Sequence, residues 1–277
     1  MNAGWLELPR SSSGSDYLTG TYYDSDGATR NYSYLYDKSM YTSMWIAYPL
    51  SASDLSGTQA TSNGWSAADG IPASDQINVW NASYNVIYGQ TAYVDNASTA
   101  SEYYARGHQI PDADRQYNKT MLPQTYYAIN STPQIQNKFN GGIWQELEKA
   151  VRAVAQSSSD VVYVATGPAF VRADGAGTET VTRITPKGDP TKTCPVPNYY
   201  WKVLLKVKKS GDTITKACTI GFWFVHQQYN DSSAYADHAV SVNEIERRTD
   251  LDLFANLPDD LEDDAEANTS WTTFQSF

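Results

Sequence analysis

One segment of the sequence has a strong helical period, and it constrains the fold more than any other. It runs from about residue 140 to residue 156 and reads NGGIWQELEKAVRAVAQ. Apolar side chains recur in it at spacings of three and four, which predicts a helix with one face in the core. These side chains are Ile143, Leu147, Ala150, Val151 and Val154. This is the helix that stands out in the chain.

Strand-like runs lie on both sides of this helix. Alternating tyrosines and a second apolar run in residues 30–50 predict an antiparallel hairpin. Residues 161–170, VVYVATGPAF, predict a buried strand that ends at a Gly-Pro turn, and residues 194–224 predict a second hairpin that turns around 209–212. The runs do not repeat and show no regular strand–helix–strand rhythm. The fold class is therefore α+β, with a mainly antiparallel central sheet flanked by helices.

Three features at the ends of the chain define its expected organisation. Residues 1–20 end in RSSSGSDYLTG, which predicts a flexible N-terminal segment. No boundary follows, so residues 21–277 are expected to form a single domain. Ser241 with Glu244 three residues later predicts the start of a last helix. The acidic run PDDLEDDAEA, from about residue 258, predicts a solvated and mobile C-terminal tail.

The sequence also bears on where the protein works. No apolar run approaches the ~18 residues that a membrane-spanning helix needs. The first residues lack the basic start and apolar stretch of a signal peptide. Asn-x-Ser/Thr triplets occur at seven positions, two of them (Asn118 and Asn130) in the expected active site, where a glycan would block access. Either the protein is cytoplasmic or its signal peptide is not in this chain, and the triplets argue against a eukaryotic secretory origin. A secreted or periplasmic bacterial protein fits these observations better.

The two cysteines, Cys194 and Cys218, bracket the expected second hairpin. If the strands pair from a turn near residue 210, the two side chains lie at the far ends of the strands and come within bridging distance. A disulfide is slightly favoured over two buried thiols, and it would suit an oxidising compartment.

The net charge of −11 is unevenly distributed. Residues 101–160 hold six basic and six acidic side chains, whereas the flanking segments are acidic. A polyanionic partner is therefore not excluded in the central block, although the chain as a whole is acidic.

The central block carries the residues with the clearest chemistry. Asn140, Trp144, Glu148 and Arg152 are four apart, so they would form one stripe beside the apolar face of the helix. An amide oxygen and a carboxylate two turns apart can hold a hard cation such as Mg²⁺, which accepts few protein ligands and keeps several waters. Upstream lies Arg-Gly-His with His108, one of only three histidines. A neutral imidazole beside an arginine suits removal of a proton near a phosphate.

Four motifs occur in order along the chain. They are RGHQIPDADR (106–115), NSTPQ (130–134), FNGGIWQELE (139–148) followed by Arg152, and VVYVATGPAF (161–170). Together they resemble the DNA/RNA non-specific endonucleases of the ββα-metal type, with weaker similarity over residues 30–260. A single Arg-Gly-His would be a weak signal, but four ordered motifs with suitable spacing are a strong one.

The resemblance implies a central antiparallel sheet with a ββα metal-binding element. It implies a metal-dependent phosphodiester hydrolase, an endonuclease acting on DNA and RNA without base preference. His108 corresponds to the general base and Arg106 to the arginine before it. Asn140 corresponds to the one protein ligand of the catalytic Mg²⁺, for which Mn²⁺ can substitute.

The resemblance also assigns supporting residues. Glu148 corresponds to the acid that holds metal-bound water, Arg152 to a transition-state arginine and Asn130 to a supporting active-site asparagine. The family usually has an acid before Arg-Gly-His, where this chain has Ala105. This departure puts in doubt the support that neighbouring groups give to the site residues, and hence the rate of the reaction and the affinity for the metal.

Less specific interpretations apply to several of these residues. Trp144 is expected to pack in the core, and His226 and His238 are expected to be structural because they lack acidic neighbours at ligand spacing. Asp112 and Asp114 are expected to orient Arg115 or cap a turn in a polar loop. Glu148 and Arg152 taken alone could form a surface ion pair.

A second hypothesis is a nuclease-like scaffold that binds nucleic acid or a cell-surface carbohydrate without cleaving it. Ala105, the acidic balance, and the many tyrosines and tryptophans motivate it. Metal at Asn140 would favour the enzyme, and binding insensitive to a chelator would favour the module. No pattern in the sequence indicates an oligomeric state.

Overall fold

The computed structural model describes residues 4–10, 14–60, 64–170 and 179–277. Its main feature is a sheet of seven strands in the order β1-β2-β3-β6-β9-β10-β11, in which every neighbouring pair is antiparallel. The strands are β1 (Tyr17–Tyr23), β2 (Arg30–Asp37), β3 (Thr42–Leu50), β6 (Val162–Ala169), β9 (Tyr199–Ser210), β10 (Thr213–Val225) and β11 (Ala239–Val240). The predicted α+β class with an antiparallel sheet is confirmed.

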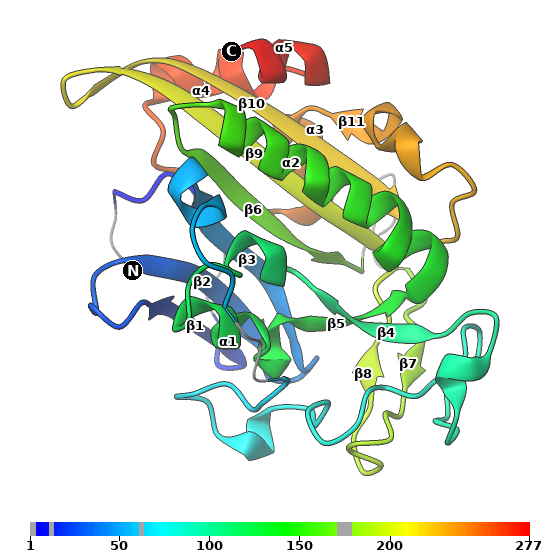
Figure 1. Cartoon of the computed structure of the whole chain (residues 1–277). Helices are drawn as coiled ribbons and strands as arrows, with labels where there is room; N and C mark the ends of the chain where they lie inside the picture. The colour runs from blue at the N-terminus through cyan, green and yellow to red at the C-terminus, as the bar shows by residue number, and fades with distance from the viewer. Residues whose placement is uncertain (1–3, 11–13, 61–63, 171–178) are drawn as a thin grey trace.

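A second, smaller unit holds the expected active-site motifs. Strands β4 (Tyr104–His108) and β5 (Ser131–Ile135) form an antiparallel pair. They are followed by the π-helical segment η6 (Gln136–Trp144) and the long helix α2 (Gln145–Ser157). Figure 1 shows α2 lying across one face of the large sheet, with β4 and β5 at its N-terminal end. Two strands followed by a helix constitute the expected ββα arrangement.

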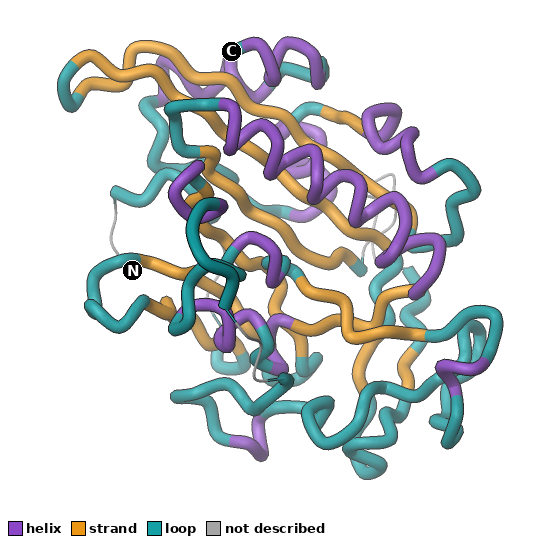
Figure 2. Tube along the Cα trace, viewed as in Figure 1, coloured by secondary structure: helices purple, strands orange, loops and turns teal. Residues whose placement is uncertain are grey.

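The remaining elements are short. They are η1 (Ala52–Leu55), η2 (Ala73–Asp75), η3 (Ala97–Thr99), η4 (Asp112–Asp114), α1 (Met121–Thr125), η5 (Ala128–Asn130), β7 (Arg183–Ile184), β8 (Cys194–Pro195), η7 (Ser232–His238), α3 (Val242–Thr249), α4 (Asp259–Glu266) and α5 (Trp271–Ser276). Figure 2 shows that the chain between β3 and β4 is mostly loop.

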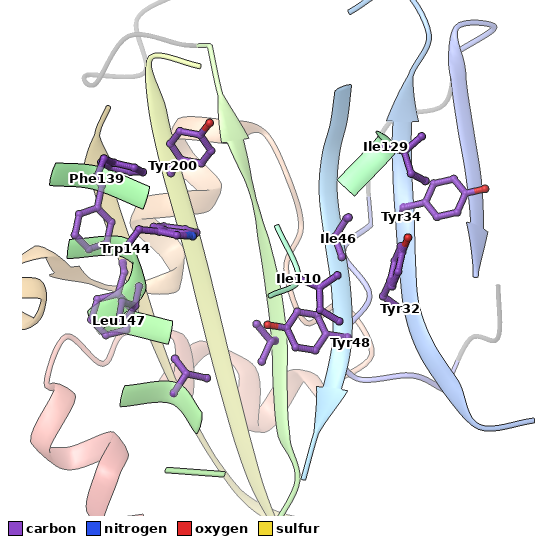
Figure 3. Close-up of a cluster of buried hydrophobic side chains, with 14 of the residues drawn as sticks. Tyr32, Tyr34, Ile46, Tyr48, Ile110, Ile129, Phe139, Trp144, Leu147 and Tyr200 are labelled. Carbon is purple, nitrogen blue, oxygen red and sulfur yellow. The ribbon is translucent and has the colours of Figure 1, made fainter. Parts of the chain in front are cut away.

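The sheet has a separate apolar core on each face. Side chains alternate across a strand, so Tyr200 and Leu204 of β9 point to the face covered by α2, whereas Trp201 and Val203 point to the other. Figure 3 shows the first core, in which Phe139 and Trp144 of η6 pack against Tyr200 and Leu147 of α2 follows further along the helix. The second core is closed by α3, α4 and residues near the N-terminus. The ββα unit is thus anchored on one face only.

The predicted helix is interrupted near its start. Gly142 has φ −130° and ψ −119°, values outside the helical region, and α2 begins only at Gln145. Glycine tolerates this conformation because it has no Cβ. The stripe of residues spaced by four therefore holds from Trp144 through Glu148 to Arg152, but Asn140 lies in the preceding irregular turns. The predicted helix start at about residue 140 is therefore corrected to Gln145, and Asn140 lies before the break in the π-helical segment.

Both terminal segments differ from expectation. Leu6 and Leu8 are buried in the second core, Arg10 pairs with Asp252, and β1 begins at Tyr17, so residues 5–10 and 17–20 belong to the folded domain and not to a flexible lead-in. The acidic run forms α4, whose Ala265 is buried. Helix α5 follows and contributes two aromatic side chains, Trp271 and Phe274, to the first core. The C-terminal segment is therefore a packed helical one.

The second hairpin forms, but the cysteines do not meet. Cys218 pairs with Lys206 on the neighbouring strand, whereas Cys194 lies on β8 and pairs with Ile184. Both thiols are free and buried, so the disulfide prediction was wrong. The strand at 161–170 also continues through its Gly-Pro pair to Ala169, because Gly167 has no side chain to clash with the backbone oxygen of Met44.

Candidate active site

His108 is the last residue of β4 and lies between two aromatic rings. Its ring centroid is 4.7 Å from that of Trp65 and 4.9 Å from that of Tyr126. Its Nε2 atom is buried and has no hydrogen-bond partner among the described residues. Burial lowers the pKa of His108 to about 4, with Asp112 acting to raise it and Arg106 to lower it. The imidazole is therefore neutral at pH 7 and has an uncommitted nitrogen.

Arg106 lies two residues before His108, on the same face of β4. Its guanidinium stands 5.2 Å from the ring centroid of Trp65, and its Nη1 donates to the Val79 carbonyl at 2.8 Å. Gly107 between them packs directly on the Gln134 side chain, which a Cβ would approach to 2.2 Å. The glycine is thus required for the β4–β5 pair to close at this point.

Asn130 is fully buried and uses its whole amide inside the protein. Its Oδ1 accepts from the backbone N–H groups of Gln109 and Ile110 at 3.2 and 2.9 Å. Its Nδ2 donates to the carbonyls of Ile110 and Thr125 at 2.9 and 2.6 Å. Asn130 therefore fixes the chain that leaves His108 and has no group left for a substrate.

The short helix η4 links the two halves of the site. Asp112 accepts a hydrogen bond from the Tyr126 hydroxyl at 2.6 Å, and Tyr126 packs edge-on against His108. Asp114 is buried and pairs with Arg152 at 3.0 Å, while its other oxygen accepts from the Tyr48 hydroxyl at 2.9 Å.

These roles of Asp112 and Asp114 were not foreseen. The sequence signal for them was the position of DAD, four residues after His108. The expectation that one of them orients Arg115 is met by the backbone of Asp114, whose carbonyl accepts from Arg115 Nη1 at 2.8 Å. The side chain of Asp114 is committed to Arg152 and Tyr48, and only its backbone carbonyl accepts from Arg115.

Glu148 and Arg152 lie one turn apart on α2 and are both partly buried. Arg152 is held by Asp114, so the predicted pair of Glu148 with Arg152 is replaced by a larger group of charges. Burial raises the pKa of Glu148, and the positive charges of Lys202 and Arg152 oppose that shift. Asp112 acts electrostatically on both His108 and Glu148. The helix η4 therefore lies within electrostatic range of both predicted halves of the site.

Asn140 has the donor chemistry that a hard cation needs. Its Nδ2 donates to the Gln136 side chain at 3.0 Å, while its Oδ1 meets no donor in the described part of the chain. No three side chains of His, Cys, Asp or Glu gather into a metal-binding group within the described residues. A cation at Asn140 would thus have few protein ligands, which Mg²⁺ accepts.

The other two histidines are structural, as expected. His226 accepts from the Ile135 N–H at Nε2 (3.0 Å), and its Nδ1–H donates to the Pro197 carbonyl at 2.8 Å. His238 packs against Phe224, with ring centroids 4.6 Å apart. Trp144 is buried in the core, as expected.

Comparison with known proteins identifies the family of this chain. A family model described as DNA/RNA non-specific endonuclease matches residues 17–260. The chain belongs to this family. The match covers β1 through α3 of the fold, including every candidate site residue.

Several curated relatives carry nuclease names. Nuclease C1 of Cunninghamella echinulata var. echinulata is 30% identical over 165 residues, which cover 58% of this chain and 62% of that protein. A nuclease of Serratia marcescens is 30% identical over 163 residues (57% and 53%), and the mitochondrial nuclease 1 of Schizosaccharomyces pombe is 26% identical over 155 residues (56% and 47%). The chain thus matches about half the length of these endonuclease-family relatives.

A solved structure shares the fold. A chain in the crystal structure of the EndoG/EndoGI complex superposes with a TM-score of 0.58 at 20% identity, covering 92% of this chain and 90% of that one.

The relatives do not single out one compartment. They include mitochondrial nucleases of two yeasts as well as the Serratia protein, so a bacterial exported origin stays a prediction. Among the described residues, no helix is long and apolar enough to cross a membrane.

Proposed function

We propose that this protein is a metal-dependent endonuclease that hydrolyses phosphodiester bonds in DNA and RNA. Membership of the endonuclease family supports the reaction class. The observation that carries the proposal is the neutral His108, whose buried Nε2 has no hydrogen-bond partner among the described residues and which stands beside Arg106. Such a nitrogen is free to accept a proton from an attacking water.

The other residues act by charge and by position. Arg106 and Arg152 would stabilise the negative charge that develops on the phosphoryl oxygens. Asp114 holds Arg152 in place, and Asn130 holds the backbone that follows His108. The rings of Trp65 and Tyr126 contact the imidazole and limit its movement. Each of these contacts reduces the motion of a group that must meet the scissile phosphate.

Mg²⁺, with Mn²⁺ as a substitute, is the cofactor that fits the residues present. Asn140 would hold the ion through its Oδ1, which accepts no hydrogen bond from a described residue, and Glu148 would hold it through water. When bound, the ion stabilises charge on the leaving oxygen. Glu148 remains within range of both Arg152 and Lys202, which favour its ionised form.

The test is cleavage of supercoiled plasmid and of a single-stranded RNA, with Mg²⁺ and with excess chelator. We expect both substrates to be degraded only with Mg²⁺, and we expect His108→Ala to abolish degradation. Cleavage by His108→Ala at the wild-type rate would overturn the proposal. Tight binding without cleavage, unchanged by chelator, would instead support the nuclease-like binding module.

A further inference from the structure

The middle of β9 carries a lysine in a place where lysine is unusual. Lys202 lies between Thr166 of β6 and Phe222 of β10 in the register of the large sheet. It is 1% exposed, and its Nζ atom has no hydrogen-bond partner among the described residues. A buried ammonium is costly unless it is paired. Nothing in the sheet itself accounts for this charge.

The side chain points toward the active-site helix. Alternation along β9 places Lys202 with Tyr200 on the face covered by α2. The Nζ atom is 5.0 Å from the ring centroid of Trp144, which lies one turn before Glu148. Figure 3 shows Trp144 and Tyr200 in the layer between helix and sheet. The ammonium therefore lies beneath the turn of α2 that carries Glu148.

The neighbouring charges leave one carboxylate for this ammonium. Both oxygens of Asp114 are already used, one by Arg152 and the other by Tyr48. Burial lowers the pKa of Lys202, and the charge that most opposes the shift is that of Glu148. In turn, burial raises the pKa of Glu148, and Lys202 is the charge that most opposes that rise.

We propose that Lys202 is a positioning residue that holds the Glu148 carboxylate from the sheet side, as Asp114 holds Arg152. Each working side chain of α2 then has a dedicated, buried counter-charge from another element. The inference rests on the proposed function, because it assigns Lys202 a part in the same reaction. Lys202 touches no substrate in this scheme and acts only through Glu148.

The experiment compares Lys202→Met with a matched control, Lys206→Met. Lys206 is 2% exposed on the same face of β9, but it contacts the C-terminal residues through the Gln275 carbonyl at 3.4 Å. We expect Lys202→Met to lower kcat about 10- to 100-fold, the usual effect of removing the support of a metal-site residue. We expect KM to change by less than about threefold, because Lys202 contacts no substrate.

Thermal unfolding without metal separates positioning from simple packing. The Lys202 Nζ atom makes no hydrogen bond to a described residue, and burial raises the pKa of Glu148 to about 7, so Glu148 can take up a proton when the ammonium is removed. The substitution then leaves no buried charge without a counter-charge, and replacing a buried charge by an apolar side chain of similar shape is often neutral or stabilising. We therefore expect Lys202→Met to keep or raise Tm while kcat falls, and Lys206→Met to keep kcat. The inference would be overturned if Lys202→Met lowered both kcat and Tm and Lys206→Met lowered them to the same extent.

A double-mutant cycle tests whether Lys202 acts through Glu148. In the Glu148→Gln background we expect Lys202→Met to change kcat by less than about twofold, because the group that it positions is already neutral. If the fall in kcat of the double variant equalled the product of the two single-variant falls, Lys202 would not act through Glu148. Wild-type kcat in Lys202→Met, with His108→Ala inactive, would overturn this inference alone. Cleavage by His108→Ala at the wild-type rate would overturn the proposed function instead.

Discussion

The two partly buried histidines at the ends of the β4–β5 pair differ in one respect. Burial lowers the pKa of both His108 and His226 to about 4, so both are neutral at pH 7. His226 sits at the Ile135 end with both ring nitrogens hydrogen-bonded. His108 sits at the Ser131 end and leaves its Nε2 unused in the described part of the structure.

The comparison teaches that burial alone does not mark a functional histidine. A structural imidazole uses its hydrogen-bonding capacity within the fold. A general base must keep one nitrogen for its reaction, and the fold bears the cost of leaving that nitrogen without a partner. The predictions below separate these two cases, starting with the largest expected effect.

Replacing His108 with phenylalanine should remove activity and spare stability. The ring contacts with Trp65 and Tyr126 survive, and Nε2 has no hydrogen bond to a described residue that the substitution would remove. Loss of a general base lowers kcat by about 10²- to 10⁴-fold. Plasmid cleavage and urea unfolding measure the two effects. A stability loss as large as that of His226→Phe would show that His108 is structural.

Asp114→Asn should weaken catalysis by a smaller factor, because Arg152 keeps its charge but loses its ion-pair partner. We expect kcat to fall about 10- to 100-fold. Asp160→Asn is the control, since Asp160 also pairs with a cation, Lys208, but both side chains of that pair are more exposed than those of Asp114 and Arg152. Equal kcat in Asp114→Asn and Asp160→Asn would exclude the positioning role of Asp114.

His226→Phe should reverse the pattern of His108→Phe. The substitution leaves the Ile135 N–H and the Pro197 carbonyl without their partner. An unsatisfied buried group costs about 1–3 kcal/mol of the free energy of unfolding. We expect that loss in urea unfolding, with kcat within about threefold of wild type. An inactive but stable His226→Phe protein would remove the distinction between the two sites.

The pH dependence of stability should reflect both histidines. The folded-state pKa of each is about 4, below the ordinary 6.5. Between these values the unfolded chain binds protons that the folded chain does not, so the free energy of unfolding rises with pH. The loss of unfolding free energy begins as pH falls through 6.5 and is complete below about 4. His226→Phe should show a shallower slope across this window, and an unchanged slope would contradict the shift at His226.

The sequence predicted the strands and the helix well where a period was present. Alternating tyrosines gave the β2–β3 hairpin, and apolar spacing gave α2. The break at Gly142 was missed because an apolar period does not report the backbone angles of glycine. The cysteine pairing failed because the register of β9 and β10 places Lys206, not Cys194, opposite Cys218.

The site was predictable only where its residues are close in sequence. His108 and Arg106 share one motif, and Glu148 and Arg152 share one helix. The partners that hold them come from distant elements: Asp114 is 38 residues from Arg152, and Lys202 lies on another strand. Such pairs depend on tertiary packing, which single-sequence patterns do not contain. A lysine inside the apolar run YYWKVLL was the one local signal for Lys202.

A crystal structure of inactive His108→Ala with Mg²⁺ and a DNA oligonucleotide tests the central claim most directly. The claim is that positions 108 and 140 act on the same phosphate from two sides. We predict a divalent ion at the Asn140 Oδ1 atom, with an uncleaved phosphate between it and position 108. An ion bound elsewhere, or DNA that passes position 108 without placing a phosphate near Asn140, would contradict it.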